Sequence, residues 1–252
     1  MKRKLAVGLL AVGMVVLGTT GASATVVLNE NFDGYTNGTL SGQGGWTATA
    51  AAATPMQVAG AADKFVQLGT SGQDEYKALS TALPHFDGNV IHTSLAVNVS
   101  AAQAAGDYFA HVSDPVATTT NFYQRLFARS SGAGYQIGLV DTSGTGSTIT
   151  YGTTVLNFNQ EYDVDINWTV VPGLINDTFA LTVDSSPYLN HIWTSTSVAE
   201  PGNISAANLR QGAAANAATV QVDDYLVEGQ IPEPASLGLL ATVAVLSLRR
   251  RK

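Results

Sequence analysis

Three carboxylates occupy alternate positions in the segment EYDVD, residues 161–165. Glu161, Asp163 and Asp165 alternate with apolar residues, so a strand would place all three on one face. Two carboxylates held roughly 5 Å apart can cleave a glycosidic bond, one as the nucleophile and the other as the acid/base. The same alternation is also typical of a strand with one solvent-facing acidic side. We favour the acidic face and predict no catalytic residue and no enzymatic activity.

Carboxylates near both ends of the chain are better candidates for a metal site. Glu30 and Asp33 come early, whereas Asp223 and Asp224 come late. If the first and last strands lie together, these oxygen ligands can share one structural Ca²⁺. Adjacent carboxylates are costly unless a cation or solvent relieves them. The alternative is that one aspartate is exposed and the other is hydrogen-bonded.

Two arginines lie four residues apart in the segment NFYQRLFAR, residues 121–129. As a strand, this segment would place Arg125 and Arg129 on one face with Tyr123 and Phe127. A guanidinium group beside aromatic rings can stack on sugars or clamp carboxylates. The alternative role is a salt bridge to one of the many acids of the chain.

The tryptophans and histidines add one further candidate. Trp46 follows the turn-like GQGG, so we expect it to be partly exposed and able to stack on a sugar, whereas Trp168 is expected in the core. The spacing of the histidines fits no zinc motif, and cysteine is absent, so the sequence gives no support for a zinc site. The histidines are His85, His92, His111 and His191.

The charge of the central region limits its partners. Residues 25–231 contain five basic and 18 acidic side chains, a net charge of −13. Such a surface repels nucleic acid and anionic lipid, and it attracts cations or basic partners. We therefore expect no nucleic-acid partner.

The elements that must position these residues are short strands. Segments of alternating or β-branched residues are separated by turn-rich connectors, and the Ala-rich runs at 48–53, 101–105 and 213–218 are interpreted as loops. This pattern predicts an all-β sandwich in a single domain over residues 25–230. The predicted strands are 90–99, 108–113, 121–129, 134–140, 161–168, 177–184 and 219–229.

The N-terminus has the three parts of a secretory signal peptide. A basic start, residues 1–4, precedes an apolar run, residues 5–17, and small residues follow. Ala22 and Ala24 fit the A-x-A cleavage pattern. We expect residues 1–24 to be removed on export; the alternative is a retained anchor helix.

The C-terminus combines a Pro-Glu-Pro motif, an apolar run and a basic end. Pro232, Glu233 and Pro234 precede the uncharged residues 235–248, whose 14 positions would extend only about 21 Å as a helix against a hydrocarbon core of about 30 Å. The apolar run is followed by Arg249, Arg250, Arg251 and Lys252. A basic cluster beside an apolar run tends to stay on the cytoplasmic side.

This three-part order resembles the PEP-CTERM sorting signal of bacterial exported proteins. The resemblance implies that a hydrophobic sorting helix in residues 231–252 inserts transiently into the inner membrane after Sec export. It further implies that an exosortase, a membrane-embedded transpeptidase, removes the tail near the motif. The alternative is an ordinary tail anchor.

A second resemblance concerns the domain between the two signals. ENFDGYTNGTLSGQGGW (30–46), RLFARSSGAGYQIGL (125–139), LRQG (209–212) and VDDYLV (222–227) together resemble the concanavalin-like, laminin-G-like jelly rolls. Glucanases of this fold carry E-x-D-x-E, to which EYDVD is similar. Together the resemblances imply a non-catalytic protein of the cell surface or extracellular matrix that is associated with exopolysaccharide. A lectin-like carbohydrate-binding module is the alternative, and a glycoside hydrolase is a more distant one.

Overall fold

The structure is a computed structural model of the chain. It describes residues 24–49, 54–69, 72–114, 116, 121–142, 147–172, 176–195, 200–212 and 216–231. The predicted signal peptide up to residue 23 and the predicted sorting signal from Pro232 onward lie outside the described residues.

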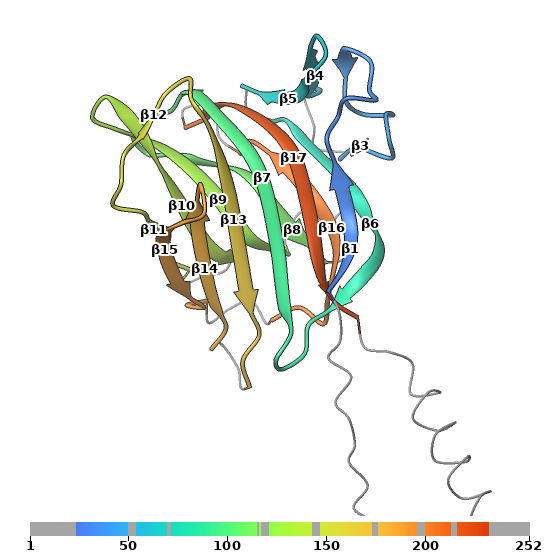
Figure 1. Cartoon of the computed structure of the whole chain (residues 1–252), viewed down its shortest axis with the longest axis vertical. Helices are drawn as coiled ribbons and strands as arrows, with labels where there is room; N and C mark the ends of the chain where they lie inside the picture. Colours follow the sequence, from blue (N-terminus) through green and yellow to red (C-terminus); the bar gives the residue numbers. More distant parts are fainter. Residues whose placement is uncertain are drawn as a thin grey trace, which may run out of the picture.

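The described chain folds as a sandwich of two antiparallel sheets (Figure 1). The first sheet has nine strands, and β1 pairs with β17 beside its main path. The first and last long strands therefore lie side by side, in the register that pairs Ala24 with Gln230. In spatial order the strands are β15 (Ser186–Ile192), β14 (Thr178–Val183), β13 (Glu161–Thr169), β7 (Val90–Ala101), β17 (Thr219–Gln230), β5 (Lys64–Leu68), β4 (Gln57–Gly60) and β2 (Gly38–Thr39), with β1 (Ala24–Glu30).

The second sheet has eight strands, with β12 paired to β10 beside its main path. Its centre is made of β9, β8 and β16, which join through antiparallel ladders. In spatial order the strands are β11 (Thr150–Tyr151), β10 (Gly134–Thr142), β9 (Phe122–Ser131), β8 (Asp107–Ser113), β16 (Asn203–Arg210), β6 (Asp74–Pro84) and β3 (Thr47–Ala48), with β12 (Leu156–Asn157).

The main core fills the space between the two sheets. Strand β13 shows how the sequence builds it, because its exposed residues alternate with buried ones along the whole strand. Its inward side chains end at Trp168, whose ring packs against those of Tyr123, Phe179 and Trp193. A second, smaller cluster of Tyr108, Phe127 and Val140 lies apart from this core.

The predicted all-β sandwich is confirmed, and each of the seven predicted strands matches an observed one. The sequence did not reveal β6 and β16, although both lie inside the second sheet. Within the part of the chain that the structure describes, no helix is long and apolar enough to cross a membrane.

Candidate functional site

Three arginines lie over aromatic rings on the outer side of the eight-stranded sheet. The guanidinium carbon of Arg125 is 4.0 Å from the ring centre of Tyr108, and that of Arg129 is 3.7 Å from the ring of Tyr151. Arg210 lies 4.6 Å from the ring centre of Phe122. These three are among only five basic residues between 25 and 231. We call Arg125, Arg129 and Arg210, with the rings beneath them, the arginine face.

Strand β9 departs from strict alternation to make this face. Gln124 has a positive φ of 51° and accepts a hydrogen bond from Thr93 of the opposite sheet, so its side chain points inward. Tyr123 also belongs to the core, whereas Phe127 packs with Tyr108 outside it. The expectation that Tyr123 shares a face with Arg125 is therefore wrong, because the left-handed residue between them interrupts the alternation.

A buried histidine lies beside this face. His111 is 1% exposed, and its ring centre is 4.3 Å from that of Phe122 and 5.9 Å from that of Tyr108. Neither of its nitrogens has a hydrogen-bond partner. Burial, and then the positive charges of Arg125 and Arg210, hold the pKa of His111 well below its usual value. The ring is therefore neutral at pH 7 and adds no positive charge.

The three guanidinium groups differ in the ion pairs and hydrogen bonds that they make within the protein. Arg210 pairs with Asp74 at 2.8 Å, and Arg129 donates two hydrogen bonds to Gln136. Among the described residues no ion pair involves Arg125 or Arg129, and the Nε of Arg125 is buried without a hydrogen-bond partner. Burial lowers the pKa of Arg125. A guanidinium group without an ion pair binds planar anions well. A carboxylate suits it best, because it can accept two parallel hydrogen bonds.

Trp46 and Glu30 belong to a different, buried network. Trp46 is 1% exposed, so the expectation of partial exposure is wrong, and its ring offers no face to a ligand. It packs against Phe32 and Tyr225 in the core. The carboxylate of Glu30 bonds Lys77 and Tyr35, with the Trp46 indole 3.4 Å away.

The other three carboxylates proposed for calcium lie near one another, joined by Asp63. Burial, and then the charges of Asp224, Asp63 and Asp33, raise the pKa of Asp223 to about 7, against a lowering by the amide of Asp224. We call these four residues the acidic cluster. The predicted set is thus only partly brought together, because Glu30 is held by Lys77 instead.

We predict that the acidic cluster makes the folded protein less stable as the pH rises. The folded state keeps a proton on Asp223 that the unfolded state releases near pH 4, so the free energy of unfolding falls as the pH rises toward about 7. After allowance for solvent screening, we expect the free energy of unfolding to fall by about 1 kcal/mol between pH 5 and pH 8. The melting temperature should fall by ~2–4 °C over the same range. The change should be smaller in Asp223→Asn, measured by thermal unfolding. Asp87→Asn, which removes an exposed acid elsewhere, should keep the whole change; an Asp223→Asn profile like that of the unsubstituted protein would contradict the assignment.

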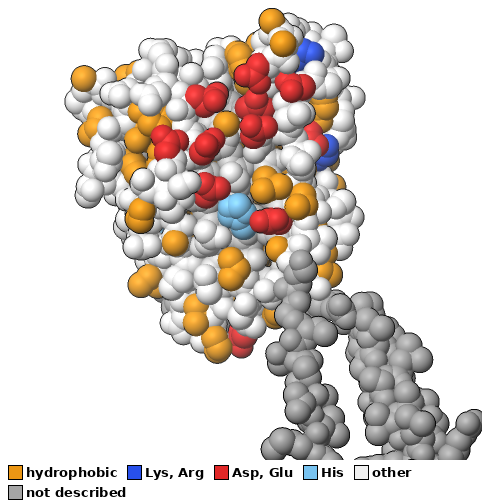
Figure 2. All heavy atoms as spheres, in the orientation of Figure 1, with side chains coloured by type: hydrophobic (Ala, Val, Ile, Leu, Met, Phe, Trp, Pro, Cys, Tyr) orange, Lys and Arg blue, Asp and Glu red, His pale blue; other side chains and the backbone are white. Residues whose placement is uncertain are grey.

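The three carboxylates of EYDVD lie on the outer side of the nine-stranded sheet, as the alternation predicted. Glu161 and Asp163 are exposed, and Asp165 lies 3.2 Å from Nε2 of His92, whose Nδ1 is 3.0 Å from Glu228. Figure 2 shows acidic side chains gathered over β13, β7 and β17. Carboxylates thus gather on the outer side of the nine-stranded sheet, whereas the arginine face belongs to the eight-stranded sheet and contains Asp74 as the partner of Arg210.

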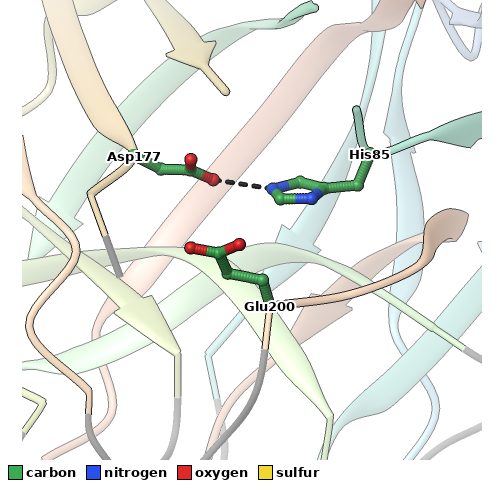
Figure 3. Close-up of side chains that lie close together, drawn as sticks. All are labelled: His85, Asp177 and Glu200. Carbon is green, nitrogen blue, oxygen red and sulfur yellow. Dashed lines mark hydrogen bonds and ion pairs between the residues drawn. The ribbon is translucent and has the colours of Figure 1, made fainter. Parts of the chain in front are cut away.

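A second group of chemistry-bearing residues lies where three loops meet (Figure 3). His85 follows β6, Asp177 precedes β14 and Glu200 precedes β16. One ligand atom from each lies within 4.8 Å of the other two, and this is the one such trio of His, Asp or Glu among the described residues. These residues could hold a metal ion, although their sequence spacing fits no metal motif.

Sequence reasoning found Arg125 and Arg129 but missed Arg210 and His111. Arg210 could have been identified as a candidate from the sequence, because it is one of only five basic residues between 25 and 231 in an acidic domain. The trio of His85, Asp177 and Glu200 has no such signal, because its members are 23 or more positions apart and meet only through the sandwich topology.

Comparison with known proteins supports the fold. No protein-family model matches the sequence, and no curated protein matches it. A carbohydrate esterase from the Shiga toxin-encoding bacteriophage phi24B is similar with a TM-score of 0.52 at 14% identity, covering 83% of this chain and 100% of its own. The CBM2 module of the evolved Dit protein from Lactobacillus casei BL23 phage J-1 has a TM-score of 0.50 at 10% identity, covering 84% and 99%. The binding domain of Paraclostridial Mosquitocidal Protein 1 has a TM-score of 0.52 at 8% identity, covering 85% of this chain and 51% of its own. At these identities the likeness shows a shared β-sandwich fold.

Proposed function

We propose that the protein is a carbohydrate-binding module whose arginine face binds sugar chains bearing carboxylate groups. The observation that carries the proposal is the stacking of Arg125, Arg129 and Arg210 on aromatic rings in an otherwise acidic domain. Guanidinium groups bind carboxylates through paired hydrogen bonds, and the rings beneath hold them in place. A carboxylated polysaccharide repeats such groups at intervals along its chain.

The names of two similar structures agree with this class of ligand. One is a carbohydrate esterase and the other a carbohydrate-binding module. Because their identities to this chain are 14% and 10%, they support the fold, and the ligand is argued from the arginine face alone.

The proposed protein is non-catalytic and works outside the cell. The sequence patterns of residues 1–24 and 231–252 support export and placement on the cell surface or in the extracellular matrix. The processing partners would be the Sec machinery and an exosortase. In this setting the module would attach to exopolysaccharide.

The calcium ion expected from the sequence would bind at the acidic cluster. Millimolar Ca²⁺ should therefore reverse the fall in melting temperature at pH 8.

The test is a binding measurement with defined polysaccharides. Affinity electrophoresis of the purified protein in gels containing polygalacturonate or alginate should show retardation, whereas gels containing dextran should not. Arg125→Gln should weaken binding by roughly tenfold or more, because a charge-assisted pair worth about 1.5–3 kcal/mol is lost.

Two controls separate this site from general charge effects. Lys64→Gln also removes one positive charge, but Lys64 donates to the backbone of Asp33 and Tyr35 and should bind like the unsubstituted protein. Arg125→Lys keeps the charge and loses the planar fork, so it should bind more weakly than the unsubstituted protein. Equal retardation by dextran, or Arg125→Gln binding as tightly as Lys64→Gln, would refute the proposal.

A further inference from the structure

We propose that His85, Asp177 and Glu200 form a binding site for one first-row divalent transition-metal ion, with Zn²⁺ as the representative. The three side chains come from separate loops and point toward one another (Figure 3). The site is separate from the arginine face, so it stands or falls independently of the proposed function.

The ligand set favours a transition metal over calcium. It combines one imidazole nitrogen with two carboxylates, whereas Ca²⁺ and Mg²⁺ prefer oxygen ligands alone. The Nε2 of His85 lies 2.7 Å from Oδ2 of Asp177. Two ligand atoms on a tetrahedral Zn²⁺ are about 3.3 Å apart, so the pair would open by roughly 0.6 Å to admit the ion. Glu200 supplies the third ligand, and water completes the coordination.

Asp177 is held in place by donors that a metal would leave intact. Its side chain is fully buried, and its Oδ2 accepts a hydrogen bond of 2.7 Å from the Trp168 indole. Its Oδ1 accepts one of 3.0 Å from the amide of Val171. Such outer contacts fix the orientation of a metal ligand. The ion would take the place of the hydrogen between Asp177 and His85 while these two bonds remain.

The loops are also joined through their backbones. The amide of His85 donates to the carbonyl of Gly202, two residues after Glu200, and the amide of Trp193 donates to the carbonyl of Asp177. The ring of His85 packs on that of Trp168, with centres 5.3 Å apart. The sandwich therefore fixes the three loops before any ion binds, and the ion would link them at one point.

His92 provides a matched control within the same chain. It too lies between two carboxylates, but its two ring nitrogens face different partners, Nε2 toward Asp165 and Nδ1 toward Glu228. No three ligand atoms converge there, since the described residues contain a single convergent trio. A histidine with carboxylate neighbours but no convergence should not bind the ion.

The experiment measures Zn²⁺ binding by the purified full chain after dialysis against a chelator. Calorimetry at pH 7.5 should give one Zn²⁺ per chain, and Zn²⁺ should raise the melting temperature by ~5 °C. Glu200→Gln and His85→Gln should each weaken binding by roughly tenfold or more, while His92→Gln and Arg125→Gln should bind as the unsubstituted protein does. Glu200 is half-buried, so Glu200→Gln keeps the test valid should His85→Gln fail to fold, as judged by circular dichroism.

Several results would overturn the proposal. One is the absence of stoichiometric Zn²⁺ binding to the folded protein, which would leave the contact between His85 and Asp177 as a hydrogen bond alone. Another is an affinity that Glu200→Gln leaves unchanged or that His92→Gln abolishes. Displacement of the ion by millimolar Ca²⁺ would also exclude a transition-metal site.

Discussion

Replacement of Asp141 by alanine should destabilise the protein by about 3–5 kcal/mol. Asp141 is fully buried, and its Oδ2 accepts hydrogen bonds from the amide and hydroxyl of Thr194 and from the amide of Ser195. Its Oδ1 accepts one of 2.6 Å from the amide of Thr142. The change would remove the acceptor of the buried amides of Thr142 and Ser195 and of the more exposed Thr194, in the segment that ties the end of β10 to the chain after β15. Denaturant unfolding followed by tryptophan fluorescence measures the loss.

The charge of Asp141 also gives the stability a dependence on acid. Burial alone would raise the pKa of Asp141, but His191, 3.8 Å away, and three backbone amides outweigh it and lower the pKa to about 2. Because the folded pKa is depressed, this stability is present above pH 4 and lost as the pH falls toward 2. Asp141→Asn should therefore cost about 2 kcal/mol at pH 7 and much less at pH 2.

The exposed Asp163 is the matched control for Asp141. Asp163→Ala should change the free energy of unfolding by less than about 0.5 kcal/mol, because its side chain lies in solvent. An Asp141→Ala protein as stable as Asp163→Ala would show that the amides around Asp141 find other acceptors.

The strands that the sequence predicts are those whose own side chains carry the pattern. β13 alternates exposed and buried residues without a break, and the same alternation is visible in its letters. The sequences of β6 and β16 lack this pattern, since DEYKALSTALP contains several polar residues and a proline, and NISAANLR contains two alanines and two asparagines. Their buried side chains, among them Leu83 and Leu209, join the core between the two sheets, a tertiary contact that no local pattern records.

Two arrangements could be predicted from the sequence: residues that share a strand, and Asp33 with Asp223 and Asp224, which the pairing of the first and last strands brings together. Arg125 and Arg129 share a strand, so the sequence shows them together. Arg210 reaches the same face because β16 pairs with β8, and β8 with β9. His85, Asp177 and Glu200 come from three loops, and their convergence depends on the whole sandwich.

Replacement of Trp168 by alanine should also destabilise the protein by about 3–5 kcal/mol, or ~10 °C in melting temperature. Trp168 is fully buried, and its ring lies 5.2 Å from that of Phe179 and 6.0 Å from that of Trp193, so alanine would leave a large cavity. Its indole also donates to Asp177. Thermal and denaturant unfolding measure the effect.

Two further variants test how much of this loss of stability comes from packing. Trp168→Phe separates packing from hydrogen bonding, and Ile192→Ala is an exposed control. Trp168→Phe keeps most of the ring contact and removes only the donor to Asp177, so it should cost about 1–2 kcal/mol. Ile192→Ala removes an apolar side chain that is 60% exposed and should cost less than about 0.5 kcal/mol. If Trp168→Phe were as damaging as Trp168→Ala, the indole bond to Asp177 would outweigh the packing. Trp168 would then act mainly by fixing Asp177, the ligand on which the proposed metal site depends.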